Sequence, residues 1–394
     1  YEKDYTIDTT LIHMYMKCGL FEEGLVVFNG ASLENLAPWT ALMNGYMDVG
    51  LDENVLDSFE KIPKSLIMDS VSVVRVLKAC GNVRAFQKGY EIQSEITKRG
   101  LLDNDPTLSN AVVDMYAGFG LLKEAEEMFD KLKVQDMLSW TAIISGYSNH
   151  GYGEKAMKYY KQMRKEGIPG DGVTFSCVLK ACGSIGASEQ GQMIYEEILT
   201  TNLLKTDIIV GNAIVDMYAN VGSIIHAQRV FDELPIRDVV SWNSLIAGYA
   251  QIGQCENVFA IFREMIREHH KPNMVTFLSI LAACSHAGLV DESHICLEAM
   301  MNAYNLVPTC KHYICMLDIF CRTGQIGNAL TLVEEMPFHP NVVSWNTILG
   351  GCQRWGEREL ANEAFEHAMF LADNNAAVYV SMSNVYANID DTMK

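Results

Sequence analysis

The sequence repeats itself, and this repetition limits the possible folds more than any other feature. VVDMYA at 112–117 returns as IVDMYA at 214–219, and LKAC at 77–80 returns at 179–182 and as LAAC at 281–284. Each of these shifts is 102 residues or a multiple of it. Four tryptophans follow nearly the same spacing: Trp39, Trp140, Trp242 and Trp345. Such self-similarity predicts an array of structural repeats.

Glycines divide each 102-residue unit into three parts. A glycine falls at 19, 50, 120, 151, 186, 222, 253, 288, 324 and 356, and the one gap closes if Arg84 takes the missing place. The spacings are then 31, 34, 36, 31, 35, 36, 31, 35, 36 and 32 residues. Glycine at such regular places is typical of the left-handed turn that ends a helix.

Each part has the pattern of two helices. In 239–273, apolar residues recur at helical spacing before Gly253 and again in the segment before Pro272, which cannot continue a helix. One helical hairpin cannot bury its own apolar face, so we expect neighbouring hairpins to stack. The predicted fold is all-α, an α-solenoid formed as a right-handed superhelix of helix-turn-helix repeats.

The same division applies to the whole chain. It gives ten repeats over 5–341 and a further segment over 342–394. The repeats are 5–35, 36–69, 70–105, 106–136, 137–171, 172–207, 208–238, 239–273, 274–309 and 310–341. The chain begins at Tyr1 and stops at Lys394 without a terminating motif, so we expect a fragment of a longer protein.

Composition and charge exclude several classes of protein. Hydrophobic residues make up 49% of the chain, which excludes intrinsic disorder. The net charge of −19 argues against a protein that coats nucleic acid non-specifically. No apolar stretch approaches the roughly 18 residues of a transmembrane helix. The 11 scattered cysteines predict buried thiols in a reducing compartment rather than a disulfide framework.

Three segments resemble pentatricopeptide repeats: DVVSWNSLIAGYAQIG (238–253), DIIVGNAIVDMYANVG (207–222) and MVTFLSILAACSHAGLVDES (274–293). The alternating lengths of 31, 35 and 36 residues are similar to the plant-type subclass with P, L and S motifs, here in S-P-L order. Residues 342–375, with AAVYVSMSNVYA after them, resemble the E-type extension of organellar RNA-editing factors. The resemblance covers residues 5–394.

The resemblance implies binding of single-stranded RNA, with one repeat for each nucleotide. In this family the fifth and the last residue of a repeat select the base. The pairs here are Thr9/Asn35, Thr40/Asp69, Val74/Asp105, Asn110/Asp136, Thr141/Asp171, Ser176/Asp207, Asn212/Asp238, Asn243/Asn273, Leu278/Thr309 and Ile314/Asn341. The family's pairings imply the target 5′-A-G-n-U-G-n-U-Y-n-n. The repeats whose fifth residue is apolar (Val74, Leu278 and Ile314) are implied to discriminate poorly between bases.

Two further places in each repeat are implied to contact RNA. The second residue sandwiches the base ring, which here means Val173, Ile209, Val240 and Val275. A basic thirteenth residue often meets the phosphates, and it is firmly cationic only at Lys17, Arg322 and Arg354. We therefore expect binding that relies on stacking and base contacts and depends weakly on salt.

Simpler roles for these residues remain open. Asp, Asn and Thr at the repeat junctions are also the side chains that cap a helix start. An Asn or Thr at a fifth place could be a solvated polar position, although both are poor helix formers. The four tryptophans are predicted to pack in the core between hairpins rather than to stack on bases.

No enzymatic activity, cofactor or metal site is predicted. A zinc deaminase needs H-x-E and C-x-x-C to hold the metal and move the proton, and neither occurs. The closest cluster is Cys284, His286, His294 and Cys296, which lacks a tight pair of ligands. No P-loop or dinucleotide-binding motif is present either.

The predicted function is sequence-specific binding of single-stranded RNA, directing C-to-U editing in a mitochondrion or chloroplast. The partner would be a deaminase, in trans or in a domain lost from the C-terminus, with no membrane or small-molecule substrate involved. The alternatives are a protein-binding helical scaffold, as tetratricopeptide arrays are, or a factor for RNA stabilisation or processing without editing. A decayed paralogue that binds nothing is a third possibility.

Overall fold

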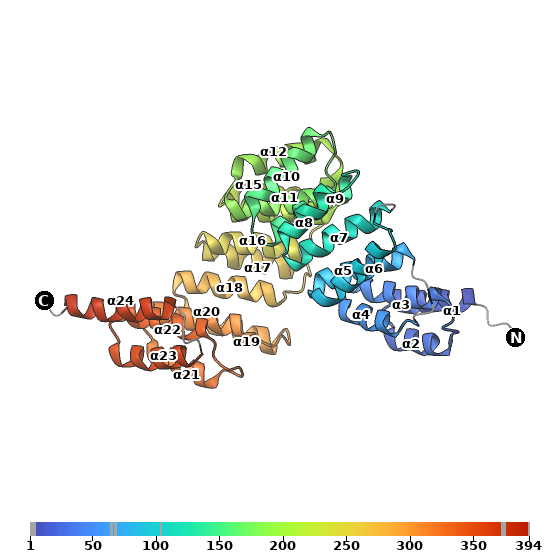
Figure 1. The fold of residues 1–394 in the computed structure, drawn as a ribbon. Helices are drawn as coiled ribbons and strands as arrows, with labels where there is room; N and C mark the ends of the chain where they lie inside the picture. The colour runs from blue at the N-terminus through green and yellow to red at the C-terminus, as the bar shows by residue number, and fades with distance from the viewer. Residues whose placement is uncertain (1–4, 64–65, 67–68, 103–104, 372–375, 393–394) are drawn as a thin grey trace. The chain divides into compact units, whose positions relative to one another are not determined.

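The computed structural model of the chain describes residues 5–63, 66, 69–102, 105–371 and 376–392. Every regular element within these ranges is a helix (Figure 1). The helices form two compact units, which divide between Ile185 and Gly186. None of the described helices is long and apolar enough to cross a bilayer.

The first unit contains five helical hairpins and one further helix. Its helices are α1 (Tyr5–Lys17), α2 (Phe21–Gly30), α3 (Leu36–Asp48), α4 (Asp52–Lys61), α5 (Ser70–Val83), α6 (Phe86–Lys98), α7 (Pro106–Phe119), α8 (Leu122–Asp130), α9 (Met137–Asn149), α10 (Gly153–Lys165) and α11 (Gly172–Ile185). The odd-numbered members are the first helices of their hairpins.

The second unit opens with the partner of such a first helix and ends on a long single helix. Its helices are α12 (Ser188–Thr200), α13 (Leu203–Thr206), α14 (Ile208–Asn220), α15 (Ile224–Glu233), α16 (Val239–Gln251), α17 (Cys255–Arg267), α18 (Met274–Ala287), α19 (Val290–Asn302), α20 (Cys310–Arg322), α21 (Ile326–Glu335), α22 (Val342–Trp355), α23 (Arg358–Leu371) and α24 (Ala376–Thr392). Here the even-numbered helices from α14 onward are the first helices.

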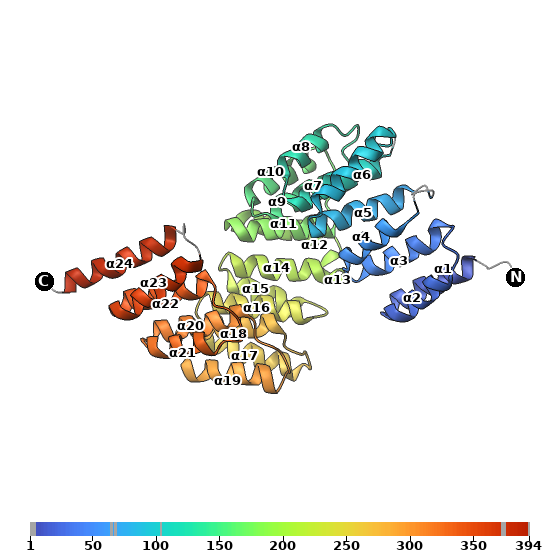
Figure 2. The same cartoon turned by 60° about the horizontal axis from the view of Figure 1, so that its bottom comes forward.

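Within each unit the first helices pack against one another in chain order. In the first unit α1 contacts α3, and the series continues through α5, α7, α9 and α11; in the second unit it runs from α14 to α24 (Figures 1 and 2). Within a unit, a second helix that lies between two first helices in the chain contacts both of them, as α4 contacts α3 and α5. This arrangement confirms the predicted α-solenoid, while its right-handed course stays a prediction.

Capping side chains determine where most first helices begin. An Asp or Asn oxygen accepts a backbone N–H from the first turn at 2.8–3.1 Å, which satisfies a donor that has no partner inside the helix. These capping residues are Asn35, Asp69, Asp105, Asp136, Asp171, Asp207, Asp238, Asn273 and Asn341. The predicted capping role is therefore confirmed for nine of the junction residues.

A left-handed residue ends each first helix from α1 to α22 or follows its last turn. All ten glycines of the predicted series have positive φ, for example 80° at Gly120 and 72° at Gly253. Arg84 takes the eleventh place with φ 56°, as the sequence spacing predicted. An L-residue in this conformation brings Cβ close to the following carbonyl oxygen, so Arg84 is strained where glycine is not.

The four regularly spaced tryptophans lie in the core, as predicted. Trp140 and Trp242 have no exposed surface, and Trp39 and Trp345 are buried as well. Each of the first three receives a phenylalanine from the preceding second helix edge to face, with ring centroids 4.7–4.8 Å apart. Such T-shaped pairs are favourable beyond the apolar area that they bury. They fix one hairpin against the next.

The cysteines are free thiols, and most of them are buried. Burial raises the pKa of Cys80 and of Cys182 to about 11. Their thiols therefore stay protonated at neutral pH, which makes them unreactive packing residues. The prediction of small buried thiols is confirmed for these positions, whereas Cys18 is exposed.

We expect Arg84→Gly to stabilise the chain by about 1 kcal/mol, because glycine adopts positive φ without the steric cost. The measurement is the free energy of unfolding in urea, followed by circular dichroism. Gly50→Ala is the matched control, since Gly50 has φ 75° and no atom within 4 Å of an added Cβ. It should lose stability by a similar amount. If the Arg84→Gly variant is no more stable than the natural chain, the proposed backbone strain at Arg84 is contradicted.

Candidate nucleic-acid interface

The fifth and last residues of a repeat are brought together by the stacking of first helices. The fifth residue lies in the second turn of one first helix, and the last residue caps the next first helix. Where the fifth residue is asparagine, its Nδ2 donates directly to the capping side chain. The three pairs are Asn110–Asp136 at 3.0 and 3.1 Å, Asn212–Asp238 at 3.0 Å and Asn243–Asn273 at 3.0 Å.

Threonine at the fifth place is linked to its neighbour through a hydroxyl. Thr141 Oγ1 lies 2.7 Å from Thr174 Oγ1, which donates to Asp171 Oδ1 at 2.6 Å. Thr40 Oγ1 likewise lies 3.1 Å from Ser72 Oγ. Both linking hydroxyls belong to the third residue of the following first helix, a position that the sequence analysis did not assign to the site.

The two remaining polar pairs are arranged differently. Ser176 Oγ donates to a backbone carbonyl of its own helix at 2.8 Å, and its predicted partner Asp207 lies in the other unit and caps α14. Thr9 is half-buried on α1, and Asn35 is exposed and caps α3. The capping role of Asp207 and Asn35 is thus established, while their role in reading a base stays a prediction.

Four of the polar fifth residues are buried rather than solvated. Asn110, Thr141, Asn212 and Asn243 are only 6–8% exposed. A buried amide or hydroxyl costs free energy unless it is hydrogen-bonded, and the contacts above supply such bonds to each of the four, although Asn110 Oδ1 has no partner. The apolar fifth residues Val74, Leu278 and Ile314 are half-buried. The simple explanation of a solvated polar position therefore does not hold for these four.

A row of exposed apolar side chains is found at the second residue of seven first helices, whereas the second residues of α1, α3, α7 and α20 are Thr6, Ala37, Thr107 and Lys311. Val173, Ile209, Val240 and Val275 are 52–65% exposed, although each belongs to a residue type that is normally buried. The row has three more members at the same place, which we did not predict: Val71, Leu138 and Val343, at 54–56% exposure. Their shared second position was the signal that would have found them.

The predicted phosphate-contacting cations differ in their surroundings. Lys17 and Arg354 are exposed in the last turns of α1 and α22. Arg322 instead forms an ion pair with Asp318 in its own helix, with Nε 2.7 Å from Oδ2. Its charge is therefore partly balanced before any phosphate approaches.

A polar cleft of about 290 Å³ lies at the ends of α5, α7 and α9 in the first unit. Its lining includes Lys78 and Arg84, and also Asn82 and Asn149, which are thirteenth residues of their repeats. Asp114 faces the same cleft; burial raises the pKa of its carboxyl group, and the Lys78 charge opposes that rise. The two cations were missed because the thirteenth place alone was searched, whereas Lys78 is a ninth residue.

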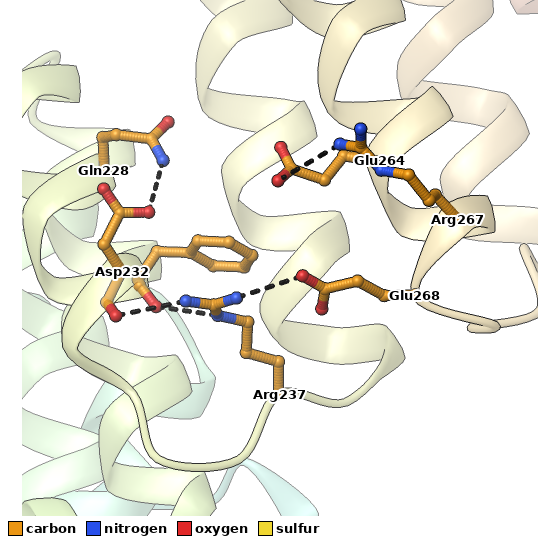
Figure 3. A network of polar contacts seen from close by, with 7 residues as sticks. Gln228, Asp232, Arg237, Glu264, Arg267 and Glu268 are labelled. Atoms are coloured by element: carbon orange, nitrogen blue, oxygen red, sulfur yellow. Dashed lines mark hydrogen bonds and ion pairs between the residues drawn. The ribbon is translucent and has the colours of Figure 1, made fainter.

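Asp238 shows how the capping residue is held in its charged form. Burial acts to raise the pKa of its carboxyl group, but hydrogen bonds from the Ser241 backbone and the Asn212 side chain outweigh burial and lower the pKa. The adjacent Arg237 anchors the segment: its guanidinium donates to the carbonyls of Phe231 and Asp232 at 3.1 Å and lies 3.4 Å from Glu268 (Figure 3). This arginine joins the ends of α15 and α17.

The cysteines and histidines that come closest to a zinc-binding pattern in the sequence differ in their burial. Cys284 and Cys296 are buried, whereas His286 and His294 are exposed. Over the described part of the chain, no group of three or more His, Cys, Asp and Glu side chains is placed to hold a metal ion.

Solved structures share this fold. The chain aligns with the pentatricopeptide repeat protein PPR10 from maize over 99% of its own length and 62% of that chain, with a TM-score of 0.63 and 17% identity. PPR10 has also been solved in complex with an 18-nt psaJ RNA element, and that structure aligns with a TM-score of 0.64 at 16% identity.

Sequence comparisons point the same way. The PPR repeat family matches residues 135–184 and 237–286, and the PPR repeat matches 9–30, 108–137 and 311–338. A mitochondrial pentatricopeptide repeat-containing protein of Arabidopsis thaliana is 32% identical over 98% of this chain and 69% of its own length. The chloroplastic pentatricopeptide repeat-containing protein CRR2, from the same plant, is 34% identical over 98% of the chain and 60% of its own length. Of two other Arabidopsis relatives the chain spans 47% and 55%. The chain therefore belongs to the pentatricopeptide repeat family.

Proposed function

We propose that this chain binds single-stranded RNA and reads it with one repeat for each nucleotide. One recurrent observation carries the proposal: a buried polar fifth residue is hydrogen-bonded to the capping region beside an exposed apolar second residue. A base could meet polar groups with its edge while its ring lies against the apolar side chain. The RNA complex of maize PPR10, which has the same fold, supports RNA binding by this chain.

The proposal assigns ten repeats to 5–341 in S-P-L order and an E-type extension to 342–394. Of that extension, 372–375 and 393–394 lie outside the described residues. The base-reading residues are those named from the sequence, and Lys17, Arg322 and Arg354 contact phosphates. Lys78 and Arg84 join them because they line the cleft at the ends of the first helices.

We further propose that the bound RNA is presented for C-to-U editing in a mitochondrion or chloroplast. The resemblance of the C-terminal segment to E-type extensions supports editing over stabilisation or processing. The mitochondrial and chloroplastic relatives support an organellar location. The deaminase would be a partner in trans or a domain of a longer chain.

The first test is binding of the ten-mer 5′-A-G-n-U-G-n-U-Y-n-n against a scrambled ten-mer by fluorescence anisotropy at moderate salt. We expect at least about tenfold tighter binding of the designed sequence, which corresponds to only one or two well-made base contacts. A helical scaffold for proteins would bind neither RNA, and equal binding of both would remove the proposed selectivity.

The second test changes one reading residue. Asn110→Thr gives repeat 106–136 the Thr/Asp pair of repeat 137–171, so we expect the preference at the fourth base to move from U towards G by about tenfold. The measurement is a panel of four ten-mers that differ at that base. Asn346→Thr, at the fifth place of the segment after the tenth repeat, is the matched control and should leave the fourth base unchanged. A panel unaltered by Asn110→Thr contradicts the assignment.

The third test concerns the carboxylate in the cleft. Asp114→Asn removes a negative charge beside Lys78, so we expect RNA affinity to rise by about threefold to tenfold and to depend more steeply on salt. Because the pKa of Asp114 is raised above 3.8, its ionised form destabilises the fold; this cost is absent below pH 3.8 and grows as pH rises through the raised pKa.

The Asp114→Asn variant should therefore melt at a higher temperature than the natural chain at pH 7 and at the same temperature below pH 3.8. If Asp114→Asn shifts the melting profile but leaves RNA affinity unchanged, Asp114 does not lie near the bound RNA. Asp232→Asn, on the second helix α15, controls for a general effect of net charge.

A further inference from the structure

A buried hydroxyl recurs at the third residue of the first helices. In capping, this residue contributes its backbone N–H, which any amino acid except proline supplies. In Ser241 and Thr276 the hydroxyl oxygen also accepts the backbone N–H of the capping residue and so completes a capping box, but this leaves its O–H available to donate elsewhere. The residues that carry the hydroxyl, all without exposed surface, are Ser72, Ser139, Thr174, Ser241, Thr276 and Ser344.

Most of these hydroxyls reach back to the fifth residue of the preceding repeat. Ser241 Oγ donates to Asn212 Oδ1 at 2.5 Å, and Thr276 Oγ1 donates to Asn243 Oδ1 at 2.6 Å. Ser72 Oγ lies 3.1 Å from Thr40 Oγ1 and Thr174 Oγ1 lies 2.7 Å from Thr141 Oγ1; since Thr174 gives its O–H to Asp171, it accepts from Thr141. Four of the ten repeats thus have a fifth residue held from the next helix.

The occurrence of the hydroxyl follows the character of the fifth residue. It comes after Thr40, Asn110, Thr141, Asn212 and Asn243. After the apolar Val74 the third residue is Leu108, and after Leu278 it is His312, whose ring bonds Thr309 and a backbone carbonyl. The three exceptions are Pro38 after Thr9, Val210 after Ser176, and Ser344 after Ile314, where the hydroxyl bonds the capping Asn341 at 3.2 Å.

We propose that this third-residue hydroxyl is a positioning residue for base selection: Ser241 and Thr276 fix the amide orientation of Asn212 and Asn243, and thereby the base that each accepts. The proposal rests on the proposed RNA-reading function. It adds a third member, from the next helix, to each pair of fifth and last residues.

Hydrogen-bond capacity explains how the orientation is fixed. Ser241 Oγ accepts from the Asp238 backbone N–H at 3.1 Å, and its one O–H is closest to Asn212 Oδ1. Asn212 Nδ2 meanwhile donates to Asp238 Oδ1. A single bond lets the amide plane turn, whereas bonds at both ends leave one orientation. The amide then offers a base one remaining N–H and one remaining lone pair in a fixed order.

This fixed order matters most for uracil against cytosine. The two bases present donors and acceptors in opposite order on the edge that pairs: uracil offers N3–H beside carbonyl oxygens, and cytosine offers an acceptor N3 beside an amino group. An amide held in one orientation can favour one of them. An amide that turns freely satisfies both, so its repeat distinguishes only pyrimidine from purine.

Asn110 provides a comparison inside the same chain. Ser139 Oγ donates to the Asp136 carbonyl oxygen at 2.8 Å instead of to Asn110, and Asn110 Oδ1 is buried without a hydrogen-bond partner. The Asn110 amide is therefore held only from its nitrogen, by both oxygens of Asp136. Removing the Ser139 hydroxyl should leave it unchanged, which makes Ser139→Ala the matched control for Ser241→Ala.

The experiment compares the natural chain with Ser241→Ala, Ser241→Thr and Ser139→Ala on ten-mers carrying U or C at the fourth, seventh or eighth base. Binding is measured by anisotropy, and thermal unfolding verifies that each variant is folded. We expect Ser241→Ala to lower the U-over-C ratio at the seventh base by about tenfold, the value of one hydrogen bond. Ser241→Thr should keep the ratio, because threonine supplies the same hydroxyl.

The other arms separate positioning from capping. Asn243 lies on α16 with Ser241, so if Ser241→Ala merely loosened the start of that helix, the U-over-C ratio at the eighth base would change as well. We expect Ser241→Ala to leave the ratio at the eighth base unchanged. We also expect Ser139→Ala to leave the ratio at the fourth base unchanged. An unaltered ratio at the seventh base, or equal losses at the seventh and eighth, overturns the proposal. If the natural chain does not prefer the designed ten-mer at all, that result would refute RNA reading itself, and this inference with it.

Discussion

The bond between a junction Asp or Asn and the free N–H groups at the start of a first helix is the interaction on which the rest of the structure depends. It sets where each helix begins, and hence which residues occupy the second, third and fifth places. The same oxygen accepts from the fifth-residue amide of the previous helix in Asp238 and Asn273. One side chain thus starts a helix, joins two repeats and contributes to the candidate interface.

The acidity of the chain takes a specific form at this interface. Lys78 and Lys180 occupy the ninth place in two of the repeats, and Asp114, Asp216 and Asp318 occupy it in three others. Arg322 is paired with one of these carboxylates and Lys78 lies near another. Cations are present, but neighbouring carboxylates reduce their field, so a bound strand would depend more on exposed apolar side chains and buried polar groups than on counterion release.

Much of the architecture followed from local chemistry that the sequence displays directly. Capping residues, glycines and Arg84 mark helix ends because each acts within a few residues of its own position. The hydroxyl of Ser241 and the ion pair of Arg322 were not predicted, for different reasons. The first joins residues 29 positions apart and is evident only once two helices are side by side. The second lies within one helix, but the search for phosphate contacts considered the thirteenth place without its neighbour four residues earlier.

The junction residue both caps a helix and contributes to the candidate interface, and this combination limits how such an array could change its target. A substitution there must still supply a short side chain whose oxygen reaches the first turn of a helix, or else that hairpin is destabilised by about 1 kcal/mol. Few amino acids meet this condition. If the chain reads RNA as proposed, changes in specificity would fall mainly at the fifth place, and the third residue of the next helix would have to change with it. Mutational drift toward a new RNA would proceed by coordinated changes across the boundary of two repeats, and a repeat transplanted alone would leave part of its own specificity behind.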